Sequence, residues 1–270
     1  MKKAISIWCF PGDMPVREAM KQAKAAGFDG IELALNEEGE PGLDRQPSQI
    51  KDIKAAADSI GIEISSFATG LGWKHPLLTR DQAMYQKAKA IHETQVRFAA
   101  ILGTDCVLSV PGTVNPDMPY AEAYERGVAA YRECAKAAEE CGVTIGIENV
   151  WNKFLVSPLE AARFIDDIGN PWVQFFFDAG NVLLFGYPEH WIPILGKRIR
   201  KVHIKDFNTA RFVFTTLLNG DVNYPAVTAA LKAVGYDDYL IAEVGPISPA
   251  FPRYLVEETS RAMDQILGRG

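Results

Sequence analysis

Residues 138–150 read AEECGVTIGIENV, an alanine- and glutamate-rich stretch that ends at Gly142 and leads into a short β-branched run. Glycine readily adopts the left-handed backbone that ends many helices, so this stretch predicts a helix, a glycine turn and a strand. The same pattern recurs along the whole chain. The glycines at these junctions are Gly27, Gly61, Gly103, Gly142, Gly169, Gly196 and Gly235.

Seven junctions introduce seven strands, and KAISIW (residues 3–8) precedes them as a first strand. A final helical stretch, RYLVEETSRAMDQIL (residues 253–267), follows the last strand. Eight strands that alternate with eight helices over about 250 residues are typical of a (β/α)8 TIM barrel. A doubly wound sheet usually has fewer strands, and its Gly-x-Gly-x-x-Gly motif does not follow the first strand here. We therefore expect an α/β fold in which residues 1–270 form a single-domain TIM barrel.

Composition narrows the class of protein further. The chain is 48% hydrophobic and carries a net charge of -6, which disfavours nucleic acids and anionic membranes as partners. Its four cysteines form no Cys-x-x-Cys pair, as expected for buried thiols in a reducing compartment. Neither a signal-like segment nor a run of about 20 apolar residues is present, so we expect a cytoplasmic protein that does not enter a membrane.

Ionisable residues stand at the ends of the last four predicted strands. Glu148 ends TIGIE, Asp178 ends VQFFFD, His203 lies in RKVHI and Glu243 follows YLIA. Their strand neighbours are apolar and should face the helices, so alternation turns all four side chains toward the barrel axis. TIM barrels build their active sites at these carboxyl-terminal strand ends.

Three carboxylates in one volume need protons or a cation to offset their charge. No matching set of inward Arg or Lys is evident in the sequence, with Lys205 as the exception. A divalent metal ion therefore explains the cluster better than a structural ion network does. Three oxygen ligands and one imidazole suit Mn²⁺, Co²⁺ or Mg²⁺, and the lack of thiolate ligands makes Zn²⁺ a weaker candidate.

The segments IENVWN, FFFDAGN, VHIKDF and IAEVG, in this order, resemble the xylose-isomerase-like barrel superfamily of sugar isomerases and epimerases. In particular they resemble sugar phosphate isomerases/epimerases, including hexulose-6-phosphate isomerase-like and ketose 3-epimerase-like members. The resemblance implies that Glu148, Asp178, His203 and Glu243 hold one divalent metal. It also implies that Glu148 and Glu243 act as acid and base on opposite faces of a sugar or sugar phosphate, through a metal-stabilised enediolate. Members of the superfamily suggest a homo-oligomer.

The expected substrate shell departs from part of the superfamily. Ketose 3-epimerases of free sugars carry a glutamate, a histidine and an arginine where this chain has Phe154, Asn181 and Thr209. The choice of sugar or sugar phosphate, and of epimerase or isomerase, therefore stays open. Candidate substrate-binding residues are Trp8, Glu32, His75, Trp151, Asn181, Lys205 and Arg211.

Several of these candidates have a second interpretation. Glu32 faces inward on the second strand, where it either meets a sugar hydroxyl or forms an interior salt bridge. The aromatic residues either stack on a sugar or pack as a lid. His92 and His190 lie in helical stretches and are expected at the surface.

Three other functions compete with the isomerase or epimerase. An inosose-dehydratase-like lyase and a non-catalytic sugar-binding barrel fit the same residues. A DNA-repair nuclease of the endonuclease IV type shares the four ligands but needs further histidines. The chain has four histidines in total and is acidic, which disfavours the nuclease.

Overall fold

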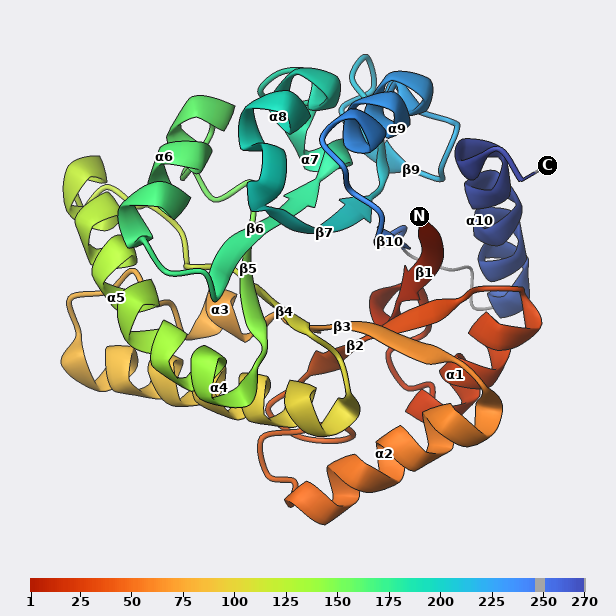
Figure 1. Cartoon of the computed structure of the whole chain (residues 1–270), viewed down its shortest axis with the longest axis horizontal. Coiled ribbons are helices and arrows are strands. Elements are labelled where there is room, and N and C mark those ends of the chain that lie inside the picture. The colour runs from red at the N-terminus through yellow and green to blue at the C-terminus, as the bar shows by residue number, and fades with distance from the viewer. Residues whose placement is uncertain (246–250, 270) are drawn as a thin grey trace.

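The computed structural model describes residues 1–245 and 251–269. In these residues, eight parallel strands close into a barrel with helices around it, which confirms the TIM barrel (Figure 1). The strands, in their order around the barrel, are β1 (Lys2–Ser6), β10 (Tyr239–Ala242), β7 (Ile199–Ile204), β6 (Val173–Asp178), β5 (Thr144–Glu148), β4 (Cys106–Ser109), β3 (Glu63–Thr69) and β2 (Gly30–Leu35).

Helices follow the barrel strands in the order that the sequence predicts. The long ones are α1 (Val16–Ala25), α2 (Pro47–Ile60), α4 (Gln82–Leu102), α5 (Tyr120–Cys141), α6 (Pro158–Ile168), α8 (Pro188–Leu195), α9 (Tyr224–Ala233) and α10 (Pro252–Leu267). Single turns form α3 (Leu71–Lys74), α7 (Ala179–Val182), η1 (Ile7–Cys9) and η2 (Gly196–Arg198). The seven junction glycines all have positive φ, and Gly142, at +66°, directly caps α5 in the left-handed region as predicted.

Two apolar layers hold the barrel together. On β6, Phe176 points inward and packs with small residues such as Ala4 and Ala34 inside the barrel. Its neighbours Phe175 and Phe177 point outward into the larger layer between the sheet and the helices. This alternation is the one used to predict inward-facing residues, and it fixes which side chains reach the barrel interior.

The structure differs from the sequence prediction in two connections. The first strand ends at Ser6 rather than at Trp8, because the Ser6 hydroxyl accepts a hydrogen bond from the Trp8 N–H and starts the turn η1. The long connection after β7 contains an antiparallel hairpin that was not predicted. It pairs β8 (Asp206–Asn208) with β9 (Val213–Thr215) at the carboxyl-terminal mouth.

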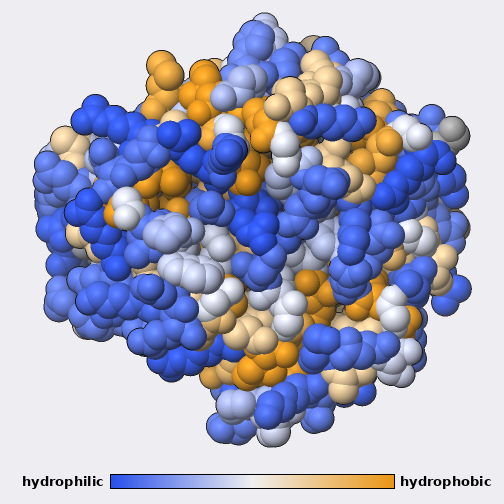
Figure 2. Space-filling view, viewed as in Figure 1, coloured by the Kyte–Doolittle hydropathy of each residue, from blue (hydrophilic) through white to orange (hydrophobic). Residues whose placement is uncertain are grey.

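The surface is that of a mostly hydrophilic protein. Figure 2 shows hydrophilic residues over much of one face, with hydrophobic residues in scattered patches between them. Among the residues that the structure covers, no helix combines the length and the apolar character needed to cross a membrane. The four cysteines are unpaired, and Cys9, Cys106 and Cys134 are buried as expected.

Candidate metal centre

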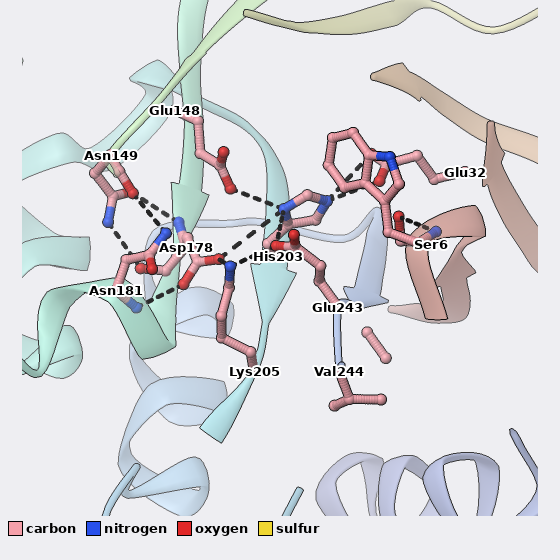
Figure 3. Close-up of polar contacts among 12 residues, drawn as sticks. Ser6, Glu32, Glu148, Asn149, Asp178, Asn181, His203, Lys205, Glu243 and Val244 are labelled. Carbon is pink, nitrogen blue, oxygen red and sulfur yellow. Dashed lines mark hydrogen bonds and ion pairs between the residues drawn. The ribbon is translucent and has the colours of Figure 1, made fainter. Parts of the chain in front are cut away.

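Four ionisable side chains meet at the carboxyl-terminal mouth of the barrel (Figure 3). Nδ1 of His203 lies 2.8 Å from Oε1 of Glu148, 3.3 Å from Oε2 of Glu243 and 4.0 Å from Oδ2 of Asp178. One possible ligand atom from each of the four residues lies within 4.8 Å of the others. The structure thus brings together the four residues that the sequence predicts to converge.

Strand register explains why these side chains share one direction. Asp178 at the end of β6 pairs with His203 on β7, and Glu148 at the end of β5 pairs with the inward-facing Phe176. Paired residues of neighbouring parallel strands face the same side of a sheet. Glu243 follows the last residue of β10, and its N–H donates to the carbonyl oxygen of Ile204 on β7. The ends of four separate strands therefore bring these side chains into one cluster.

Asparagine side chains fix Asp178 in place. The Oδ1 atom of Asp178 accepts the N–H of Asn181 at 2.7 Å. The Asn149 side chain accepts the N–H of Asp178 at 2.8 Å and donates to its carbonyl oxygen at 2.9 Å. Asn181 in turn donates from its side chain to the Asn149 carbonyl oxygen at 2.9 Å. These bonds lock Asp178 with Oδ1 satisfied and Oδ2 turned toward the other candidate ligands.

Lys205 lies beside the cluster, just after β7. Its Nζ is 2.5 Å from Oε2 of Glu243 and 3.1 Å from Oδ2 of Asp178, and it stands over the ring of Phe214. Lys205, the exception among the Arg and Lys residues in the sequence analysis, therefore lies in the site itself. This volume still contains more carboxylates than ammonium groups, with Glu148, Asp178 and Glu243 against Lys205.

Burial and crowding shift the protonation of the cluster. Burial raises the pKa of Glu148 to about 7 although His203 opposes the shift, and it also raises the pKa of Asp178. Burial alone would raise the pKa of Glu243, but Lys205 and His203 outweigh it and lower that pKa to about 2. Burial would lower the pKa of His203, yet the carboxylates of Glu32 and Glu148 hold it well above its usual value. The site as a whole favours added positive charge.

The donor set fits a divalent cation. Oδ2 of Asp178 and Oε2 of Glu243 are buried, and the groups nearest to them are cationic: Nζ of Lys205 for both and, for Glu243, Nδ1 of His203 at 3.3 Å. Buried polar atoms normally have hydrogen-bond partners, so such oxygens are suited to a cation. Three carboxylates and one imidazole match the preferences of Mn²⁺, Co²⁺ and Mg²⁺. Within residues 1–245 and 251–269, this is the single cluster of its kind.

A cavity opens beside the cluster, over the ends of the first three strands. Its volume is about 440 Å³. The residues that line it are Trp8, Leu35, Asn36, Glu37, Gly70, Leu71, Trp73 and Glu243. Glu37 accepts a hydrogen bond from Nε2 of the buried His75 at 2.9 Å and pairs with Lys74. Glu243 thus belongs both to the candidate metal centre and to the wall of a cavity of ligand size.

The predicted substrate-binding residues fall into distinct places. Trp8 lines the cavity, whereas His75 lies behind Glu37 and does not line it. Trp151 donates from its indole N–H to the Asn181 carbonyl oxygen at 3.0 Å and packs on Phe214 of the hairpin. Arg211 is exposed at the turn of that hairpin. The predicted residues therefore surround the mouth without forming one continuous surface.

Glu32 occupies the position that its second interpretation describes. Its side chain is fully buried and lies 3.0 Å from Nε2 of His203, with Ser66 as a second partner at 2.7 Å. The carboxylate does not line the cavity, and its contact with a sugar hydroxyl stays a prediction. The interior salt bridge is the interaction present.

The three positions that depart from the free-ketose epimerases make contacts within the protein. Phe154 packs among the rings of Tyr120 and Phe164. Asn181 supports Asp178, and the Thr209 hydroxyl donates to Asp221 at 2.5 Å. The site is therefore built without the polar side chains that those enzymes carry at the corresponding positions.

Two polar residues escaped the sequence prediction. Asn149 lies in IENVWN without a predicted role, although a polar residue at a buried position requires hydrogen-bond partners. His92 was expected at the surface, and this was wrong. It is buried, its Nε2 lies 2.6 Å from the Ser109 hydroxyl, and helical periodicity alone did not distinguish this face from the exposed one.

Comparison with known proteins gives matches over most of the chain. Residues 20–265 match the family model described as a xylose isomerase-like TIM barrel. L-ribulose-5-phosphate 3-epimerase UlaE of Salmonella paratyphi C is 24% identical, over 93% of this chain and 89% of the relative. 2-epi-5-epi-valiolone 7-phosphate 2-epimerase of an Actinoplanes species is 26% identical, over 70% of this chain and 67% of the relative.

Solved structures share the fold. D-psicose 3-epimerase of Clostridium cellulolyticum H10, solved with D-tagatose, superposes with a TM-score of 0.85 at 19% identity, over 99% of both chains. The match to the family model covers most of the chain, and the barrel has the architecture that the model describes. The chain therefore belongs to the xylose isomerase-like TIM barrel family.

Proposed function

We propose that this protein is a divalent-metal-dependent epimerase that acts on a ketose or ketose phosphate at the carbon next to the carbonyl group. The observation that carries the proposal is the placement of two glutamates, Glu148 and Glu243, on strands separated by β6 and β7 in one buried cluster. Epimerisation needs one group that removes a proton from a carbon and a second group that returns one to the opposite face.

Glu148 and Glu243 are suited to these two roles. A carboxylate of one accepts the proton from the substrate carbon, and the carboxylic acid of the other donates a proton from the opposite side. The reverse reaction exchanges the two roles, so neither residue is acid or base alone. A divalent cation held by Glu148, Asp178, His203 and Glu243 would supply positive charge that stabilises the negative charge developing on the substrate oxygen.

Other residues of the mouth bind and orient the substrate. Lys205 places an ammonium group beside Asp178 and Glu243, where it is positioned to donate a hydrogen bond to a substrate oxygen. Trp8 and Trp73 offer partly exposed rings in the cavity, and aromatic faces pack well against the C–H groups of a sugar. The cavity therefore supports a small sugar whose reacting end lies at Glu243.

The relatives favour epimerisation over aldose–ketose isomerisation. The two relatives described above are named as epimerases of phosphorylated compounds, and the superposed structure is a psicose epimerase. A lyase or a silent sugar-binding barrel would use the same residues, so the reaction itself must be measured. Among the residues that the structure describes, no specific contact favours either alternative.

Deuterium incorporation from D₂O tests the proposal. The Mn²⁺-loaded protein is incubated with a panel of free ketoses and ketose 5-phosphates, and label is located by NMR. We expect deuterium at C3 together with the C3 epimer of at least one substrate. Deuterium at C1 with formation of an aldose would replace the epimerase by an isomerase, and loss of water would indicate a lyase.

Matched variants separate chemistry from folding. Glu148→Gln and Glu243→Gln should lower the exchange rate about 10²- to 10⁴-fold, whereas Glu63→Gln should leave it intact. Glu63 is a strand glutamate too, but it lies at the amino-terminal end of β3 and pairs with the exposed Lys2. No exchange with any sugar would contradict the proposal and favour a binding function.

A further inference from the structure

Glu32 is a buried carboxylate that the proposed proton transfer does not use. It lies on β2, and its two oxygens are 3.0 and 3.1 Å from Nε2 of His203. The Ser66 hydroxyl on β3 donates to Glu32 Oε2 at 2.7 Å. A carboxylate withdrawn from water needs such donors, so Glu32 depends on His203 and Ser66 for its place in the barrel.

The two nitrogens of the His203 ring face two different sets of carboxylates (Figure 3). Nδ1 faces the carboxylates of Glu148, Glu243 and Asp178, while Nε2 faces Glu32 on the other side of the ring. A neutral imidazole carries one proton, and a nitrogen that gives its electron pair to a cation carries none. If Nδ1 is the ligand, the proton must be on Nε2, where Glu32 accepts it.

We infer that Glu32 is a positioning residue that holds His203 with Nε2 protonated and Nδ1 directed at the candidate metal centre. The inference rests on the cation of the proposed function. A half-turn of the ring about its Cβ–Cγ bond would place carbon atoms against both Glu32 and the three carboxylates. Glu32 therefore opposes the wrong ring orientation as well as the wrong tautomer, as carboxylates behind metal-binding histidines do elsewhere.

Packing around the ring supports this role. The ring of Phe176 contacts His203 edge-on at a centroid distance of 4.5 Å, and the His203 side chain is fully buried. Phe176 limits sideways movement of the ring, but an apolar contact does not distinguish one nitrogen from the other. The hydrogen bond to Glu32 supplies that distinction.

Binding of Mn²⁺ to the full chain, followed by electron paramagnetic resonance, tests the inference. Glu32→Leu should weaken Mn²⁺ binding about 10- to 100-fold. Glu32→Gln should weaken it less, because an amide oxygen still accepts the Nε2–H. Ser66→Ala should weaken it a few-fold, whereas Ser109→Ala should not change it. Both serines have buried hydroxyls on neighbouring strands, but Ser109 contacts His92 and Tyr131 rather than Glu32.

A spectroscopic measurement separates positioning from a merely structural role. Pulsed resonance of the Mn²⁺-saturated protein detects coupling to the nitrogen of a directly bound imidazole. We expect this signal in the wild type, its loss in His203→Asn and its weakening in Glu32→Leu. If Glu32 had only a structural role, its variants would melt at a lower temperature. The folded molecules would still bind Mn²⁺ with the affinity and the nitrogen coupling of the wild type.

The outcomes distinguish this inference from the proposed function. Wild-type Mn²⁺ affinity and nitrogen coupling in Glu32→Gln, Glu32→Leu and Ser66→Ala would overturn it, and so would absence of Mn²⁺ binding by the wild type. If Glu32→Leu does not fold, Mn²⁺ binding by Glu32→Gln and Ser66→Ala decides whether the inference holds. Weakened binding in the Glu32 variants, without exchange of any ketose by the wild type, would uphold the inference and refute the proposed function.

Discussion

The two ends of the barrel both carry charged residues, but their charges are balanced differently. At the amino-terminal end, Lys201 and Arg200 pair with Asp105 and Asp238, so two cations meet two carboxylates. At the carboxyl-terminal mouth, Glu32, Glu148, Asp178 and Glu243 surround Lys205 and His203. A balanced network needs no further counter-charge, whereas an excess of buried carboxylates favours the uptake of a cation.

The largest effect is expected at the carboxyl-terminal mouth, where carboxylates are in excess. Glu148→Gln or Glu243→Gln should lower the rate of proton exchange about 10²- to 10⁴-fold, because each removes a group that transfers a proton. The melting temperature of the metal-free protein should stay the same or rise in Glu148→Gln, because burial disfavours the charged form of that carboxyl group and raises its pKa. It should fall in Glu243→Gln, because the Glu243 carboxylate pairs with Lys205 and His203, which lower its pKa. Rates of deuterium exchange and thermal unfolding measure the two effects. A large fall in melting temperature with an unchanged rate would place the glutamates in a structural network.

A smaller effect is expected at the balanced end. Lys201→Met should destabilise the protein by about 2 kcal/mol, below the cost for a fully buried pair, because Asp105 is half exposed and regains water. This corresponds to a fall of about 4–8 °C in melting temperature. Activity per folded molecule should not change. Lys2→Met, which breaks the exposed pair with Glu63, is the matched control and should cost less than 1 kcal/mol.

Asn149 supports the carboxyl-terminal site indirectly, through hydrogen bonds from its side chain to the backbone of Asp178. Asn149→Ala should weaken Mn²⁺ binding about 10-fold, since Asp178 loses the side chain that holds its backbone. Asn152→Ala is the matched control. Its side chain donates to the Gly112 carbonyl oxygen and accepts from the Phe154 N–H, so it also bonds to backbone, but away from Asp178. Equal weakening of Mn²⁺ binding by both variants would attribute the effect to general loosening of the loop.

The smallest effect concerns the cavity wall. Trp8→Ala should raise KM about fivefold with a smaller change in kcat, because one aromatic face for the substrate is lost. Tyr187→Ala removes an exposed aromatic ring that does not line the cavity and serves as the control. Steady-state kinetics with the substrate found by deuterium exchange measure both. If the two variants behave alike, Trp8 does not contact the substrate.

Much of the fold was predictable because local rules governed it. Glycine at the helix ends has positive φ for steric reasons that do not depend on distant residues, so Gly142 and the other junctions were identified directly. Alternation along short apolar strands then placed Glu148, Asp178 and His203 on the inner face. The hairpin at residues 206–215 was missed because it lies within one long connection and pairs only three residues on each strand.

The details of the site depend on residues far apart in the sequence. Glu32 pairs with His203 across 171 positions, and no local pattern decides between that contact and a substrate hydroxyl. The ion pairs of Lys205 require the relative placement of β6, β7 and β10, which periodicity does not give. The face that His92 presents to Ser109 likewise follows from packing of α4 against the sheet. Residue type predicted the cluster, while geometry was needed to assign partners.

The central claim is that the carboxyl-terminal mouth binds one divalent cation through Glu148, Asp178, His203 and Glu243. Titration of the wild type and Asp178→Asn with Mn²⁺ tests it most directly, because asparagine keeps the oxygen that accepts the Asn181 N–H and removes the charge. We predict one bound Mn²⁺ per chain in the wild type and a loss of binding in Asp178→Asn without loss of folding. No bound ion in the wild type, or equal binding in the variant, would contradict the claim.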